Sequence, residues 1–257
     1  MSNTTPVRRL SATTVAIMTA IAFSLGSPIS TAADPERTTV TSEQALSAKQ
    51  QTIVRIAAAA ALGDMSQLDE SLNQGLDSGL TVSEAKEILV QLYAYTGFPR
   101  SLNALGQLMK VLDARKQRGV QDAPGRGPAA AIPTGKELLA LGTANQTELS
   151  GTPVRGPLFE FSPQVDEYLK THLFGDIFGR DNLDWQSREL ATVSALAAMS
   201  GVESQLQSHV RISLNVGLTG AQLSQLAAAL AESGQPEAAR RAQAAIQQVL
   251  PNLKVTK

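Results

Sequence analysis

The sequence has 257 residues, of which 43% are hydrophobic and only 4% aromatic, and its 22 basic residues nearly balance its 23 acidic ones. That balance excludes proteins that bind nucleic acid through a basic surface, because no positive excess is left to neutralise phosphates. The absence of cysteine excludes thiol peroxidases, disulfide reductases and zinc sites with sulfur ligands. Abundant alanine and few aromatic residues favour closely packed helices over sheets.

Residues 1–33 are predicted to be a secretory signal peptide. Arg8 and Arg9 give a basic start, residues 13–25 form an apolar run that is short for a bilayer, and residues 30–33 (STAA) are small enough for cleavage. Removing the two arginines leaves 20 basic residues against 23 acidic ones. We therefore expect a periplasmic or secreted protein with no membrane attachment after cleavage. The arginine pair leaves open the general or the twin-arginine export route, and an uncleaved anchor is the alternative.

A first repeat is predicted over residues 34–112. Apolar residues recur there at helical spacing, and each run ends at a glycine. Thr81 to Glu84 (TVSE) is a capping box, in which hydroxyl and carboxylate satisfy the first free amides of a helix. The expected helices, with their stop signals, are 41–62 before Gly63, 64–78 before Gly79, 81–96 before Gly97-Phe98-Pro99, and 100–112.

Residues 113–157 are predicted to be a linker rich in proline and glycine. Its basic cluster, residues 115–118, is interpreted as a solvated helix end rather than a binding patch, and residues 136–141 as a short helix. Aromatic residues concentrate in the next segment, 159–184. Such density predicts a segment that packs across a groove or between subunits.

The pattern of the first repeat then returns, because residues 183–219 can be laid over 45–81 without a gap at an offset of 138 positions. A second capping box, Thr219 to Gln222, follows at the equivalent place. The sequence therefore predicts an all-α fold. Two tandem helical repeats, residues 34–112 and 158–257, would pack together as a pseudo-dimer.

Several motifs resemble one known family. AYTGFPRSLNAL (94–105) is similar to the GFP-containing helix junction of the carboxymuconolactone decarboxylase family. RELATVSALAAM (188–199) with HVRISLNVGLT (209–219) is similar to its Arg-Glu-Leu and His…Asn-x-Gly signature. The resemblance, to a duplicated and exported form, implies an alkylhydroperoxidase D-like fold and homo-oligomers. In the alkylhydroperoxidase branch a Cys-x-x-Cys pair precedes the histidine. Val202 and Gln205 stand in those places here, so that chemistry is absent.

Glu189 and His209 are the predicted catalytic residues. They lie on two antiparallel helices about a turn near residues 200–201, and at about 1.5 Å per residue they come within about 5 Å of the same height. A carboxylate that orients an imidazole forms an acid–base pair able to move a proton near neutral pH. A buried structural pair is the alternative. The first repeat has Gln51 and Ser71 at the corresponding positions, so the scaffold itself does not require the pair.

A carboxylated substrate also needs a cation and a binding wall. We prefer Arg100, beside the Gly97-Phe98-Pro99 turn, as the cation, and we also consider Arg188 and Arg211. In this hypothesis the second repeat brings the acid–base pair, and the first brings an aromatic wall and Arg100. One composite pocket would then form per chain, either within the chain or across an oligomer interface. His172 is interpreted as a packing or interface histidine, and no metal and no cofactor are predicted. The predicted substrate-binding residues are Arg100, Phe98, Tyr95, Asn103 and Arg188.

The predicted function is a lyase or isomerase acting on a small carboxylated lactone or keto acid, and the expected partners are that small molecule and further copies of the chain. Two alternatives remain open at the level of sequence. One is a non-catalytic periplasmic helical oligomer that binds a small organic acid. The other is a cysteine-free protein that carries the family's peroxidase-like label without thiol chemistry.

Overall fold

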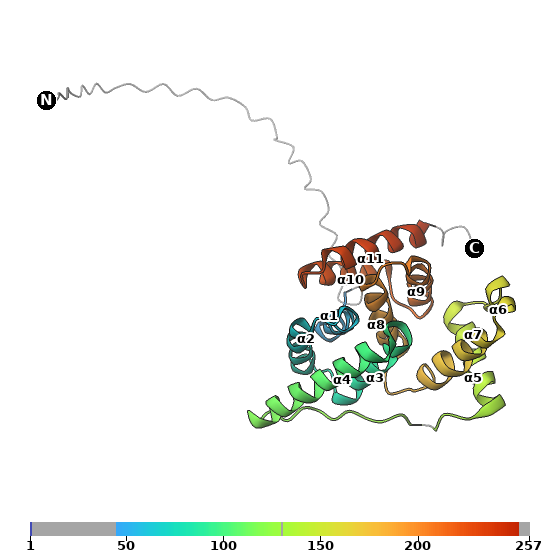
Figure 1. Ribbon diagram of the computed structural model, residues 1–257, viewed down its shortest axis with the longest axis horizontal. Coiled ribbons are helices and arrows are strands. Elements are labelled where there is room, and N and C mark those ends of the chain that lie inside the picture. The colour runs from blue at the N-terminus through green and yellow to red at the C-terminus, as the bar shows by residue number, and fades with distance from the viewer. Residues whose placement is uncertain (2–44, 130, 252–257) are drawn as a thin grey trace, which may run out of the picture. The chain divides into compact units, whose positions relative to one another are not determined.

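The computed structural model describes residue 1 and residues 45–129 and 131–251, so most of the predicted signal peptide and the start of the first predicted helix lie outside the described residues. Every regular element in the described ranges is a helix, which confirms the all-α prediction (Figure 1). No helix in this part of the chain is long and apolar enough to cross a membrane.

Two sets of four helices repeat along the chain. The first set is α1 (Ala48–Leu62), α2 (Met65–Asp77), α3 (Val82–Gln91) and α4 (Tyr93–Gln117). The second set is α8 (Trp185–Ala198), α9 (Glu203–Asn215), α10 (Gly220–Glu232) and α11 (Pro236–Val249). Shifting α2 by 138 positions reproduces the bounds of α9, so the internal duplication predicted from the sequence is present in the fold.

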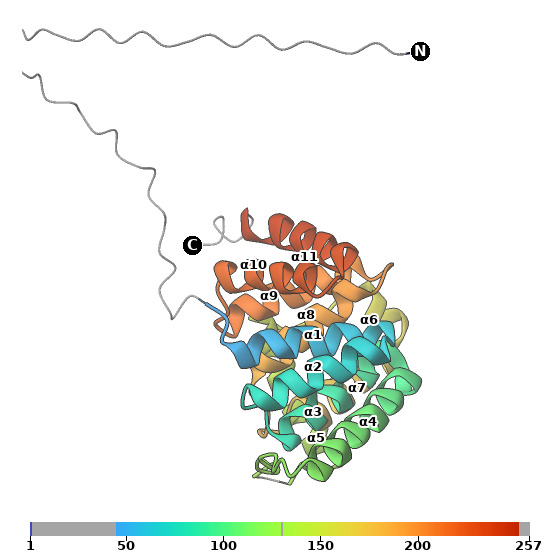
Figure 2. The same cartoon turned by 90° about the vertical axis from the view of Figure 1, so that its left-hand side faces the viewer.

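The first helix of each repeat lies at the centre of the molecule. Helices α1 and α8 pack against each other in the middle of the stack, with the other helices of each repeat outside them (Figure 2). Residues 57–60 of α1 and 195–198 of α8 are buried, and all but Leu196 are alanine. Small side chains let two helix backbones approach closely, which explains why so few aromatic residues are needed in this core.

The helix ends follow the sequence signals closely. Thr81 and Glu84 form the predicted capping box of α3, and Thr219 and Gln222 form that of α10. Gly63 ends α1 in the left-handed conformation with φ of 72°, which a residue without a side chain adopts at little cost. The predicted ends of the first two helices are thereby confirmed.

The third and fourth helices meet differently from the prediction. Helix α3 ends at Gln91 rather than at residue 96, and α4 already begins at Tyr93. Inside α4, Gly97 breaks the helical path with φ of 78° and ψ of 159°. The break falls two residues before Pro99, which lacks an amide hydrogen and disfavours helical geometry in the residue before it.

The basic cluster at the end of α4 is only partly solvated. Arg115 is buried and pairs with Asp77 at 2.7 Å and with Asp122 at 2.9 Å. The prediction of a solvated helix end is therefore wrong for this residue and holds for Lys116 and Arg118, which are exposed. Burying a cation requires partners of opposite charge, and these two carboxylates supply them.

Residues 135–178, called the insert from here on, separate the two repeats. The insert contains α5 (Gly135–Ser150), α6 (Pro157–Phe161), α7 (Pro163–Tyr168) and the π-helix η2 (Leu169–Ile177), and Figure 1 shows it beside the repeats. The short helix predicted over 136–141 is thus a helix of 16 residues. Helix α5 packs on η2 so closely that a Cβ atom added to Gly142 would lie 1.6 Å from the carbonyl oxygen of Lys170.

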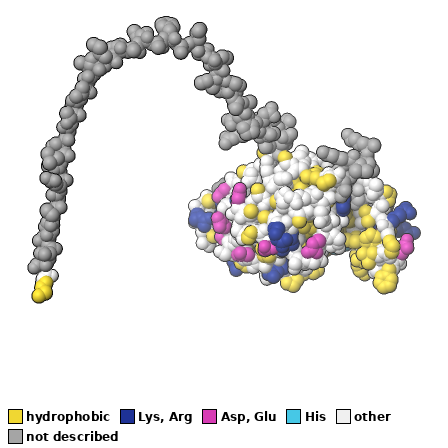
Figure 3. Space-filling view, turned by 90° about the horizontal axis from the view of Figure 1, so that it is seen from above, with side chains coloured by type: hydrophobic (Ala, Val, Ile, Leu, Met, Phe, Trp, Pro, Cys, Tyr) yellow, Lys and Arg dark blue, Asp and Glu magenta, His cyan; other side chains and the backbone are white. Residues whose placement is uncertain are grey.

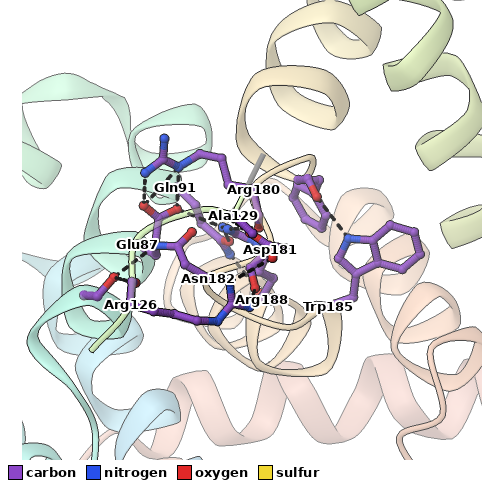
Figure 4. A network of polar contacts seen from close by, with 11 residues as sticks. Glu87, Gln91, Arg126, Ala129, Arg180, Asp181, Asn182, Trp185 and Arg188 are labelled. Atoms are coloured by element: carbon purple, nitrogen blue, oxygen red, sulfur yellow. Dashed lines mark hydrogen bonds and ion pairs between the residues drawn. The ribbon is translucent and has the colours of Figure 1, made fainter. Parts of the chain in front are cut away.

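A buried ionic network holds the chain where the insert rejoins the repeats (Figure 4). The Glu87 carboxylate of α3 accepts hydrogen bonds from Arg180 at 2.7 Å and from Arg188 at 3.1 Å. Arg188 is fully buried, donates also to Gln91 at 3.1 Å, and lies over the Phe178 ring at 5.8 Å. The second repeat and the end of the insert are therefore both tied to the first repeat through one carboxylate.

This network also fixes the charge of Glu87. Burial alone raises the pKa of its carboxyl, but Arg180, Asn182 and Arg188 outweigh burial and hold that pKa below its usual value. The carboxylate kept ionised by two guanidinium groups has a structural role, and the fully buried Arg188 is not accessible to a ligand.

Candidate functional site

Glu189 and His209 meet as the helix geometry predicts. Glu189 lies on α8 and His209 on the antiparallel α9, and the His209 Nδ1 atom is 2.9 Å from Glu189 Oε2. Glu189 is fully buried and His209 is 8% exposed. A carboxylate only accepts hydrogen bonds, so Nδ1 carries the proton and Nε2 is the basic nitrogen.

His209 lines a cavity of about 600 Å³. Because its Nδ1 is held by Glu189, Nε2 is the ring nitrogen available to the cavity. Helix α9 forms one side, the insert forms the other, and the start of α4 contributes Ala94 and Tyr95. The lining residues are Ala94, Tyr95, Gln146, Ser150, Val154, Leu158, Phe159, Val165, Leu169, Leu173, Phe174, Ser204, Gln205, Ser208, His209, Arg211 and Ile212.

Tyr95 places a phenol against the acid–base pair. Its ring meets the His209 ring edge-on, with centroids 5.4 Å apart and an interplanar angle of 82°. Its hydroxyl is buried, and although the Thr192 side chain is close enough to lower the pKa of the phenol, no group of the described residues reaches the hydroxyl in full hydrogen-bonding geometry. Burial, and then the negative charge of Glu189, raise the pKa of this phenol. The Glu189 Oε1 atom is likewise buried without a partner in the described part of the chain.

The cavity carries a positive charge. Arg211, on α9 two residues after His209, is exposed and is the one arginine or lysine among the lining residues. No aspartate or glutamate lines the cavity, and no carboxylate of the described residues lies within ion-pair distance of Arg211. A solvated guanidinium without an acidic partner at a cavity wall can bind a carboxylate through two parallel hydrogen bonds.

Of the five residues predicted to bind substrate, Tyr95 is the one that lines this cavity. Arg188 is fully buried in the network around Glu87, so it cannot reach a ligand in the cavity. Phe98 is 60% exposed and stacks on Tyr93 with ring centroids 4.3 Å apart. The break at Gly97 changes the path of α4 after Tyr95, and Phe98 therefore lies outside the cavity.

The other two predicted residues lie on α4 beyond that break. The guanidinium of Arg100 lies over the end of α1, where a Cβ atom on Gly63 would be 1.5 Å from Nη1. Asn103 is exposed. Neither residue lines the cavity. Within one chain the first repeat therefore contributes the Tyr95 part of the predicted aromatic wall but not the predicted cation.

The residues that sequence reasoning missed are mainly those of the insert. The apolar spacing of Leu138, Leu141 and Leu149 could have revealed α5, and the aromatic density of 159–178 did signal a groove. His172, interpreted as a packing histidine, lies on η2 with its Nδ1 2.7 Å from Asp176 Oδ2 and its ring 5.5 Å from that of Tyr93.

A second cleft lies where the duplication would place it. Its residues Gln67, Ser71 and Gln74 on α2 correspond, at the offset of 138, to Gln205, His209 and Ile212 on α9. Its other wall, at the end of α10, ends in Ser233, which corresponds to Tyr95. The cleft has about 310 Å³ and no histidine.

Polar contacts fill this second cleft. Arg55 donates to Gln74 at 3.3 Å and to Glu232 at 3.4 Å, and Gln67 donates to the carbonyl of Ser233. The same scaffold thus forms a polar junction in one copy and an open, largely apolar cavity in the other. The Glu–His pair is therefore a property of the His209 cavity and not of the repeat as such.

The described residues bring no group of three or more histidine, aspartate or glutamate side chains together in a way that would hold a metal ion. Fold and site together define a duplicated helical protein with one buried Glu–His pair at a cavity between repeat and insert. The chain belongs to the carboxymuconolactone decarboxylase family, whose sequence profile matches residues 34–109 and 163–248. The first matched segment covers the first repeat to within α4, and the second covers α7 and η2 of the insert together with the second repeat. A comparison with curated proteins finds no match.

Proposed function

We propose that the protein is a lyase or isomerase in which His209 moves a proton on a carboxylated lactone or keto acid. The observation that carries this proposal is the arrangement around the imidazole. His209 Nδ1 is hydrogen-bonded to the fully buried carboxylate of Glu189. The His209 side chain lines a cavity that also carries the charged guanidinium of Arg211. Membership of a decarboxylase family supports the same reaction class.

Each residue then has a defined role. Arg211 binds a substrate carboxylate and orients the carbon next to a carbonyl toward Nε2. Nε2 removes the proton from that carbon, the electron pair moves onto the carbonyl oxygen, and Glu189 stabilises the imidazolium that forms. Return of the proton at a different atom completes an isomerisation. In a decarboxylation no proton is removed first. A second carboxylate leaves as CO₂, its bonding electron pair moves toward the carbonyl oxygen, and the carbon then takes a proton that His209 relays from water, leaving hydroxide.

Exchange of substrate hydrogen for deuterium tests the proton transfer directly. The mature chain is incubated in D₂O with a panel of lactone acids and keto acids, and exchange and CO₂ release are followed by NMR. We expect turnover with at least one compound and a loss of about 100-fold or more in His209→Gln, since a positioned acid–base group contributes about 10²–10⁴-fold.

His172→Gln is the matched control, because His172 is the other histidine and does not line the cavity. Its rate should equal that of the wild type. Equal rates in wild type and His209→Gln, or no exchange with any compound that binds, would refute the proposal and leave a binding protein.

A further inference from the structure

We infer that the ligand of this cavity is an amphipathic carboxylic acid, with its carboxylate at Arg211 and a bulky apolar body between η2, α6 and α7. The inference rests on the proposed function only in that it concerns the same site, and it specifies the substrate class more narrowly than a small lactone acid.

The size of the cavity is the first argument. Pockets of about 300–1,000 Å³ enclose ligands of drug size. At about 30 Å³ for each water-sized group, the cavity of about 600 Å³ has room for about 20 such groups. A single lactone ring with one carboxylate has about half that number of non-hydrogen atoms, so it would leave much of the cavity to water.

The second argument is that the two walls differ in chemistry. Helix α9 presents hydroxyl, amide, imidazole and guanidinium groups, from Ser204, Gln205, Ser208, His209 and Arg211. The facing wall from the insert is apolar and consists mainly of Leu158, Phe159, Val165, Leu169, Leu173 and Phe174. An acid whose polar end meets α9 and whose apolar part meets the insert matches both walls, because apolar surface gains by leaving water.

The mouth of the cavity continues the apolar wall onto the surface. Leu158 lines the cavity and is 65% exposed, and Phe161 and Tyr168 beside it are 88% and 66% exposed. Hydrophobic side chains gather on this lobe of the molecule in Figure 3. A rim of this kind offers an apolar ligand a continuous path from solvent into the cavity.

The second cleft serves as an internal control for charge. The first repeat has Asn73 at the position of Arg211, and Asn73 does not line the second cleft but donates to Asp69 on its own helix. The carboxylates Glu70 and Glu232 line that cleft, whereas the His209 cavity contains none. Of these two clefts, the His209 cavity is therefore the one that favours an anionic ligand.

Calorimetric titration of the mature chain with three matched probes tests the inference. 2-Naphthoate has both features, 2-naphthamide lacks the charge, and acetate lacks the apolar body. We expect 2-naphthoate to bind at least tenfold more tightly than either of the other two. Arg211→Gln should reduce the affinity for 2-naphthoate to that for 2-naphthamide and leave 2-naphthamide unchanged.

Two further variants test the apolar wall and the second cleft separately. Val165→Ser, at an exposed lining position where folding should be unaffected, should weaken both naphthyl probes alike. Arg55→Gln, in the second cleft, is the matched arginine control and should change neither. Equal affinities for 2-naphthoate and 2-naphthamide, or an Arg211→Gln variant that keeps the selectivity, would overturn the inference.

The experiments distinguish a failure of the proposed function from a failure of the inferred ligand class. If 2-naphthoate binds selectively while no compound exchanges its hydrogen, the cavity is a binding site of the inferred class without the inferred chemistry. If small lactone acids turn over while 2-naphthoate fails to bind, the chemistry stands and the inferred substrate class is wrong.

Discussion

Replacing Gly142 by alanine should loosen the insert. Gly142 is buried in α5, and an added Cβ would lie 1.6 Å from the carbonyl oxygen of Lys170 and 2.9 Å from the amide nitrogen of Gly175. Both atoms are backbone atoms of η2, so neither can rotate away as a flexible side chain would. Relief of the overlap requires the two helices to separate.

Two opposing effects decide the sign of the change. Alanine favours a helix over glycine by about 1 kcal/mol. Forcing extra volume into a closely packed contact costs typically about 1–3 kcal/mol and more where backbone must move. We therefore expect Gly142→Ala to lower the free energy of unfolding by about 1–2 kcal/mol, and to weaken ligand binding because α5 and η2 both line the cavity.

Urea unfolding monitored by circular dichroism measures this change, provided that the slope with denaturant stays constant. Gly106→Ala in α4 is the control, because apart from its chain neighbours and the adjacent backbone of its own helix no atom lies within 4 Å of its added Cβ. It should gain up to about 1 kcal/mol from helix propensity alone. A Gly142→Ala protein as stabilised as Gly106→Ala would show that the close packing of α5 on η2 does not exist in solution.

Three further predictions concern buried polar groups. Tyr95→Phe removes a hydroxyl that has no well-placed hydrogen-bond partner. The free energy of unfolding, measured by thermal unfolding, should therefore change by less than about 1 kcal/mol, and a larger loss would show that the hydroxyl forms a hydrogen bond in solution. Arg188→Met removes one partner of a buried carboxylate and should cost about 3 kcal/mol in urea unfolding; a neutral change would contradict the network. Because the folded-state pKa of Glu87 lies below its unfolded value near 4.3, its stabilisation is present above that pH and is lost as pH falls through the folded pKa. The stability difference between wild type and Glu87→Gln should therefore shrink below about pH 4.3, and a constant difference would refute this assignment.

Local signals predicted much of the fold. The capping boxes at Thr81 and Thr219 and the glycine at position 63 mark helix ends through interactions within a few residues, and all three stand where expected. The contact of Glu189 with His209 could also be predicted, because the heights of two residues on an antiparallel hairpin depend only on the helical rise.

The rest of the site depends on packing between distant segments. The sequence makes both Arg100 and Arg211 candidates for the cation that binds the substrate carboxylate. Only the path of α4 after Gly97 and the position of the insert distinguish them. Gly142 carries no periodic signal, although its lack of a side chain lets α5 approach η2. Such contacts join residues far apart in the sequence, and no local pattern encodes them.

Two identical subunits related by a twofold axis must change together, because one gene encodes both and every substitution appears twice. Joining the two copies in one chain removes that constraint. A histidine can then enter one cleft while Arg55 and Glu232 bridge the other, and the bridge ties α1 to the end of α10. The second cleft thus adds a contact between the two copies. The chain has an open cavity in one copy and keeps a polar contact at the corresponding place in the other.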